Sequence, residues 1–114
     1  MPLTVLVGML SVVQAIQDTL EGKQRTEHVA KLRWSNDIFI KNLKIASVFA
    51  KFTALGNKDV ALVISIGVNL NSTPVADGIS LSQIMGKEVD VDRFISKLSQ
   101  KFFTNLNMLK MIGF

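Results

Sequence analysis

Residues 32–40 read Leu32-Arg33-Trp34-Ser35-Asn36-Asp37-Ile38-Phe39-Ile40, and the rest of the chain is organised around them. Apolar and β-branched residues alternate on both sides of Ser35-Asn36-Asp37, whose short polar side chains bond nearby backbone and favour turns. This pattern predicts a β-strand, a break and a second short strand. Trp34, the one tryptophan in the sequence, comes immediately before the break.

The sequence that follows predicts further strands of the same sheet. We expect strands over residues 29–35, 37–41, 44–53 and 60–70, with a tight turn at 41–43 and a hairpin turn at 55–58. In the last strand one face is apolar, and we expect it to be core: Val60, Leu62, Ile64, Ile66, Val68 and Leu70. The other face becomes small and polar at Gly67 and Asn69, which suits either a bound ligand or a packed helix.

Two helices are predicted to flank the sheet. Residues 1–17 carry no charged side chain and have a narrow polar stripe, which predicts a largely buried helix that ends at Gly22. The stripe comprises Thr4, Gly8, Ser11, Gln14 and Asp18. The apolar run is shorter than the roughly twenty residues of a membrane span and has no basic leader before it, so we expect no membrane association. The polar run 23–28 predicts a loop with an exposed His28.

The second half of the sequence is predicted to be helical after a loop at 71–74. Ser80 can cap a short helical turn that runs to Gly86. A final helix is predicted from Asp90, with Asp90 or Asp92 at its positive end. Its apolar residues recur at helical spacing: Val91, Phe94, Ile95, Leu98, Phe102, Leu106 and Leu109. Residues 1–114 are therefore expected to form a single α+β domain, with about four mainly antiparallel or mixed strands and an N-terminal and a C-terminal helix packed on them.

The composition narrows the possible chemistry. The sequence has no cysteine, which excludes disulfides and thiolate metal sites and favours a reducing, cytoplasmic location. A single histidine argues against a histidine metal site or a Ser-His triad, and no metal site is evident. The net charge is +4, but the basic residues are scattered and no aromatic residues are interleaved with them, so we expect no nucleic-acid binding. A mildly basic groove for a phosphate-bearing ligand is compatible with the same charge.

Three short motifs together resemble the biotin protein ligase family, which is related in fold to lipoate ligases. The family has a Lys/Arg-Trp-Pro-Asn-Asp strand, then Lys-Ile/Leu-Gly/Ala-Gly, then a strand that ends in Gly-Ile/Val-Asn. Here the corresponding residues are Arg33-Trp34-Ser35-Asn36-Asp37, Lys44-Ile45-Ala46-Ser47 and Gly67-Val68-Asn69. Their order and spacing match, and the resemblance covers almost the whole chain. It implies part of the fold shared by biotin ligases and class II aminoacyl-tRNA synthetases.

The resemblance implies a function and a site. The family forms biotinyl-5′-AMP from biotin and ATP with Mg²⁺, then transfers biotin to a lysine of the biotin carboxyl carrier domain of a carboxylase. By position, Lys44 would be catalytic and meet the biotin carboxylate. The nucleotide and substrate would contact Trp34, Asn36, Asp37, Ala46, Ser47, Gly67 and Asn69. From the residues alone, the favoured interpretation of Trp34 is a core tryptophan, and that of Asn36-Asp37 is a turn that satisfies its own backbone.

The sequence also departs from the family pattern. Ser35 replaces proline, and Ser47 replaces a glycine, where a β-carbon would crowd a ligand lying on the backbone. The family's upstream strands, its Gly/Arg-rich loop and its small C-terminal barrel have no counterpart here, so we expect a truncated or divergent ligase. Biotin and lipoate cannot be separated on these motifs. The alternative is a non-catalytic half-domain that acts as a homodimer or with a partner chain that completes the sheet.

Overall fold

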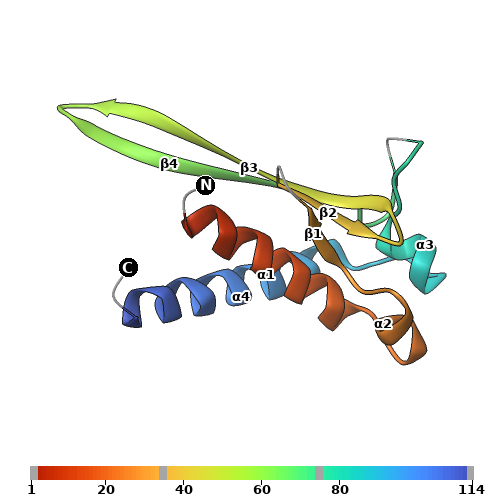
Figure 1. Ribbon diagram of the computed structural model, residues 1–114. Helices are drawn as coiled ribbons and strands as arrows, with labels where there is room; N and C mark the ends of the chain where they lie inside the picture. Colours follow the sequence, from red (N-terminus) through yellow and green to blue (C-terminus); the bar gives the residue numbers. More distant parts are fainter. Residues whose placement is uncertain (1–2, 34–35, 74–75, 113–114) are drawn as a thin grey trace.

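The computed structural model describes residues 3–33, 36–73 and 76–112 of the chain. Figure 1 shows a sheet with the two long helices side by side beneath one of its faces, and a short helix near one end. The elements in chain order are α1 (Leu3–Thr19), α2 (Lys23–Glu27), β1 (Lys31–Arg33), β2 (Asp37–Ile40), β3 (Leu43–Gly56), β4 (Asp59–Val68), α3 (Leu81–Met85) and α4 (Val91–Met111). The predicted α+β class with an N-terminal and a C-terminal helix is confirmed.

The four strands form one antiparallel sheet in the order β1-β2-β3-β4. Two-residue turns join β2 to β3 and β3 to β4, and both central residues of each turn have positive φ: 50° and 65° at Lys41 and Asn42, 49° and 70° at Asn57 and Lys58. Such turns match the right-handed twist of the strands, and asparagine tolerates the left-handed conformation. Both turns therefore fall where the sequence predicts them.

The core lies between the sheet and the helices. Its fully buried apolar side chains come mainly from α1 and from the inward faces of β2 and β3: Met9, Val12, Ile16, Ile38, Ile40, Ile45 and Val48. No helix among the described residues is long and apolar enough to cross a membrane.

The polar stripe of α1 faces α4. The Asn105 side-chain amide donates to Ser11 Oγ at 3.0 Å and to Gln14 Oε1 at 2.8 Å, and Lys101 Nζ lies 2.8 Å from Asp18 Oδ2. Ser11 is fully buried, and its hydroxyl donates to the Val7 carbonyl. Because every buried polar group must be paired, the stripe fixes the register of one long helix against the other.

The caps of the last two helices follow the sequence pattern. Ser80 caps α3 in a capping box with Gln83, and Gly86 ends the helix with a φ of 72°. At the start of α4, Asp90 Oδ1 accepts a hydrogen bond from the Arg93 backbone N–H at 3.1 Å. These caps satisfy backbone groups that a helix end leaves unpaired.

Three expectations are corrected by the structure. The first helix ends at Thr19, and Gly22, with a φ of 56°, begins α2 instead of ending α1. The polar run predicted to be a loop contains α2, and His28 after it is half-buried, with Nδ1 3.1 Å from the Gln24 carbonyl oxygen.

Three residues of the predicted apolar faces are exposed, one from the strand face predicted to be core and two from the apolar stripe of the last helix. They are Val60, Val91 and Ile95, exposed by 61%, 46% and 53%. Val60 is exposed because the far end of the β3–β4 hairpin projects beyond α1 and α4, so no helix covers it (Figure 1).

Candidate functional site

The open face of the sheet, turned away from α1 and α4, carries most of the predicted site residues. Asp37 pairs with Ser47, and Ser47 pairs with Gly67, so these three residues lie across β2, β3 and β4 on one face. Ile38, next to Asp37, points into the core. Strand alternation thus separates the core from a surface of small and charged residues.

A β-bulge brings Lys44 onto the same face as Ser47. Residues an odd number of positions apart on a regular strand point to opposite faces. Here the register shifts between Ile38 and Phe39, so that Phe39 pairs with Lys44 while Asp37 pairs with Ser47. Ile45 is the extra residue of the bulge, and both it and Ala46 are buried.

Lys44 forms an ion pair with Asp37. Its Nζ lies 3.3 Å from Asp37 Oδ1, and the two side chains are 37% and 27% exposed. The backbone of Lys44 is held by the segment before α3: its N–H donates to the Asp77 carbonyl, and its carbonyl accepts from the Ile79 N–H. This parallel bridge, Lys44 to Gly78, covers the edge of β3 where β4 has already ended. The ammonium group is therefore accessible from solvent, and the backbone that carries it is held in place.

Asn69 supports the Lys44 segment from the end of β4. Its side-chain amide donates to the carbonyl oxygens of Lys44 (3.3 Å) and Ile79 (3.2 Å), and its backbone N–H donates to the Ile45 carbonyl (2.8 Å). Both amide hydrogens are thus used within the protein, whereas the side-chain oxygen is an acceptor. The predicted contact between Asn69 and a nucleotide stays a prediction, restricted to that oxygen.

Gly67 leaves the centre of the open face bare. A β-carbon built at Gly67 would meet only Ser47 Oγ, at 3.8 Å, which is an ordinary contact distance. Neither a steric conflict nor a positive φ requires glycine at this position. The space above it is available to a ligand. Ser47 is half-buried beside it, and its Oγ borders this space.

The remaining predicted residues are placed differently. The side chain of Ala46 lies in the core, so only its backbone could border a ligand. Asn36 adopts a positive φ of 78°, and its carbonyl accepts from the Val48 N–H, which ties the break before β2 to β3. Trp34 and Ser35 lie outside the described residues. Within the described ranges, no three histidine, cysteine or acidic side chains form a group that could hold a metal ion.

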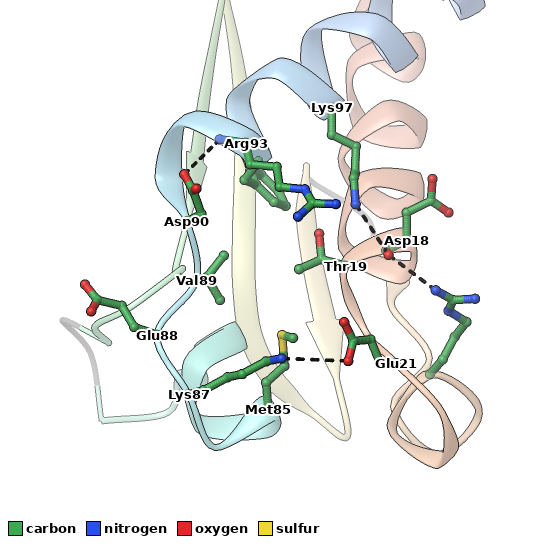
Figure 2. A pocket seen from close by; sticks show the side chains of 12 residues that line it. Asp18, Thr19, Glu21, Met85, Lys87, Glu88, Val89, Asp90, Arg93 and Lys97 are labelled. Atoms are coloured by element: carbon green, nitrogen blue, oxygen red, sulfur yellow. Dashed lines mark hydrogen bonds and ion pairs between the residues drawn. The ribbon is translucent and has the colours of Figure 1, made fainter.

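A second hollow, of about 320 Å³, lies between the end of α1, the loop after α3 and the start of α4. Figure 2 shows two contacts of its charged side chains: Lys87 pairs with Glu21, and Lys97 donates to the Asp18 carbonyl. The Arg25 guanidinium donates to the carbonyls of Gln17 and Leu20 and so closes the end of α1. These contacts tie the end of α1 to α2, to the loop after α3 and to the start of α4.

Sequence reasoning missed two parts of the site. The ion pair between Lys44 and Asp37 depends on the bulge, which no local pattern indicates. The support from Asp77 and Ile79 comes from a segment distant in sequence. A sequence signal for that segment was Ser80, whose cap fixes the start of α3 directly after it.

Comparison with known proteins identifies relatives of the chain. The model of the biotin/lipoate A/B protein ligase family matches residues 1–71. Biotin–protein ligase 2 of Arabidopsis thaliana is 31% identical over 70 residues, which are 61% of this chain and 20% of that protein.

Solved structures agree with this match. The biotin protein ligase of Aquifex aeolicus in complex with biotin and ATP superposes with a TM-score of 0.75 and 27% identity over 95% of this chain and 44% of its own. The Leishmania major biotin protein ligase, at 18% identity and a TM-score of 0.69, shares the fold. The chain thus spans less than half the length of these relatives. It belongs to the biotin/lipoate A/B protein ligase family.

Proposed function

We propose that this chain forms the part of a biotin–[acetyl-CoA-carboxylase] ligase that binds the nucleotide and the biotin carboxylate. The supporting observation is the Lys44 ammonium group, held by Asp37 on the open face beside the bare surface at Gly67. Membership of the family and the likeness to the Aquifex aeolicus ligase in complex with biotin and ATP point to the same chemistry.

In the first reaction, a carboxylate oxygen of biotin attacks the α-phosphorus of ATP. The new P–O bond gives biotinyl-5′-AMP, and the bond to the β-phosphate breaks so that pyrophosphate leaves with the electron pair. Lys44 stabilises the negative charge on the attacking and transferring oxygens, because a fixed cation needs no reorganisation as that charge develops. Asp37 holds the ammonium in place until the substrate oxygens arrive.

Other residues of the open face shape the nucleotide site. Gly67 and Ser47 form its floor, and the Asn69 side-chain oxygen accepts a hydrogen bond from the nucleotide. Trp34 and Asn36 border the nucleotide end. Mg²⁺ is commonly bound by one or two carboxylates together with substrate phosphates, and Asp37 fits that donor set; the ion would neutralise phosphate charge.

In the second reaction, a lysine amine of a biotin carboxyl carrier domain attacks the acyl carbon of biotinyl-5′-AMP, and AMP leaves. The acceptor lysine must reach Lys44 from the side of the sheet that α1 and α4 do not cover (Figure 1). We propose the cytoplasm as the location.

The test is to incubate the purified chain with biotin, ATP and Mg²⁺ and to detect biotinyl-5′-AMP by mass spectrometry. Calorimetry with ATP measures binding in parallel. We expect Lys44→Ala to lower the rate about 10²- to 10³-fold, as loss of a transition-state donor does. Lys51→Ala, which removes an exposed lysine from the same strand, is the matched control and should leave product and binding unchanged. A folded chain that gives no product, or that binds ATP equally well without Lys44, contradicts the proposal.

A second candidate function is assembly through the sheet edge. β4 is an edge strand of the described sheet, and the β3–β4 hairpin exposes Phe49, Phe52, Leu55, Val60 and Val63. Unpaired edges next to apolar surface favour pairing with another chain. We propose a homodimer as this form of the protein. Size-exclusion chromatography with light scattering tests it, and a monomer at high concentration contradicts it.

A further inference from the structure

An apolar groove lies between β4 and α4, on the side of the sheet that the helices cover. It has a volume of about 380 Å³, and apolar side chains of the two elements form most of its lining: Leu62, Ile64, Ile66, Leu98, Phe102 and Phe103. Val60, two residues before Leu62 on the same strand face, is 61% exposed, and Phe103 is 63% exposed. Exposed apolar surface that is gathered in one concave place is characteristic of an interaction site.

The backbone of β4 presents hydrogen-bonding groups directly beside this groove. β4 is an edge strand of the described sheet. The Asn69 N–H donates to the Ile45 carbonyl of β3, and the pairing of β3 with β4 is regular from Val68 back to Val60. Successive residues of a strand point their N–H and C=O groups to opposite sides, so the odd-numbered residues of β4 bond to β3. The even-numbered residues 62, 64 and 66 therefore point theirs away from β3, to the edge.

The same three residues thus form both the edge and one wall of the groove. Leu62, Ile64 and Ile66 direct their backbone groups to the edge and their side chains into the groove. A strand that bonds to this edge places every second side chain on the same side as theirs, over Leu98 and Phe102 of α4. Main-chain donors and acceptors next to a pocket for alternate side chains are the two elements of recognition by β-strand addition.

We infer that this edge binds a separate polypeptide through an extended strand with apolar side chains at every second position, and that this polypeptide carries the ligase half that the present chain does not match. The chain superposes over 95% of its own length but only 44% of the Aquifex aeolicus ligase. The inference rests on the proposed function for the identity of the partner. The free edge and the groove determine where the partner binds and in which conformation.

A second copy of this chain fits the groove less well. The inward side chains of its β4 already line a groove of its own, so two paired β4 edges would join two grooves without filling either one. A strand that carries no helix beneath its inward face can place its side chains in the groove. The two occupants differ in the mass of the assembly and in whether the chain alone protects its edge.

The experiment titrates the full chain with the segment of the Aquifex aeolicus biotin protein ligase that lies outside the match. Calorimetry gives the affinity, and size-exclusion chromatography with light scattering gives the stoichiometry, which we expect to be one to one. Leu62→Lys places a charge in the groove, and Leu62→Pro removes one N–H that faces the edge, a change that edge strands tolerate. Each variant should weaken the complex about tenfold or more.

The matched control is Val63→Lys. Val63 adjoins Leu62 on the same strand and is 49% exposed, but its side chain lies on the open face and its N–H bonds to β3. The control adds the same charge and should change the affinity less than about twofold. Leu62 is only half-buried, so its variants should fold, and circular dichroism verifies this.

Amide hydrogen exchange, followed by NMR, examines the edge one residue at a time. In the chain alone the amides of residues 62, 64 and 66 should exchange fast, and those of residues 63 and 65, which bond to β3, should exchange slowly. The partner segment should slow exchange at 62, 64 and 66 about tenfold or more and leave 63 and 65 unchanged.

Absence of a complex, or a complex that Leu62→Lys and Val63→Lys weaken equally, overturns the inference. Slow exchange at 62, 64 and 66 in the chain alone, together with the mass of a dimer, also overturns it and assigns the edge to a second copy. Formation of biotinyl-5′-AMP tests the ligase proposal separately. A complex through this edge that forms no biotinyl-5′-AMP contradicts only the proposed function, whereas biotinyl-5′-AMP formed by a chain that binds no partner segment contradicts only this inference.

Discussion

Gly67→Ala should raise the free energy of unfolding and lower the affinity for the nucleotide. The new methyl group meets Ser47 Oγ at an ordinary 3.8 Å, and the backbone at Gly67 has no positive φ. Alanine in a strand avoids the entropy that glycine loses on folding, so we expect the free energy of unfolding to rise by about 0.5–1 kcal/mol. For a chain of this size that raises Tm by about 2–6 °C. The same methyl group occupies the floor on which the nucleotide is proposed to lie, so ATP affinity should fall at least about tenfold, or about 1.4 kcal/mol.

Gly8→Ala is the matched control for this prediction. Gly8 lies in α1 on the covered side of the sheet, where a β-carbon would meet Ile64 and Val48 at 3.6 Å, again an ordinary contact. It should also stabilise the chain, by up to about 1 kcal/mol, and leave ATP binding unchanged. Differential scanning fluorimetry and calorimetry on both variants provide the measurements. If Gly67→Ala binds ATP as tightly as the wild type, or loses stability, the nucleotide does not lie on this surface and the argument from Gly67 is refuted.

Three further variants test the fold. Ile16→Ala removes a fully buried side chain and should lower the free energy of unfolding by about 2–5 kcal/mol in urea titrations. Ser80→Ala removes the cap of α3 and should cost about 1–2 kcal/mol by the same measurement; an unchanged midpoint would contradict the role of the cap. The hydrogen bond and charge of Lys101 lower the pKa of Asp18 despite its partial burial, so the unfolded chain binds more protons in acid. Lys101→Met should therefore destabilise by less than about 1 kcal/mol above pH 4, with the difference vanishing as the pH falls below the lowered pKa and in 1 M salt.

The local pattern was sufficient for most of the fold. The turns at Lys41-Asn42 and Asn57-Lys58, the caps at Ser80 and Asp90, and the alternation of β4 each depend on a few adjacent residues, and all are found where the sequence predicts them. The polar stripe of α1 was recognised as a stripe. Its partner Asn105, far away in the sequence, could not be named, because only the tertiary fold brings the two helices together.

The wrong predictions concern a helix that is too short to show an apolar period and side chains whose exposure depends on the tertiary fold. Residues 23–28 carry no apolar period, so the short α2 had no signal; Arg25, which donates to carbonyls at the end of α1, ties it in place. Val60 and Ile95 follow a core period yet are exposed, because periodicity says which face a residue takes and not whether another element covers that face. The site was predicted residue by residue from motifs, while the contact between Lys44 and Asp37 needed the register of the strands.

The β-bulge at Ile45 decides which face of the sheet the Lys44 side chain takes. Deletion of this one residue would leave the pairing of β3 with β4 intact, from Ala46 to the hairpin turn. It would also bring Lys44 next to Ala46, which points into the core, so that regular alternation would keep Lys44 on the open face and only the buried Ile45 side chain would be lost. If Ile45 were kept but paired without a bulge, Lys44 would instead point into the core beside Ile40, and the surface beside Gly67 would lose its cation. The bulge therefore lets the chain keep Ile45 as a core residue and Lys44 as a surface cation at the same time.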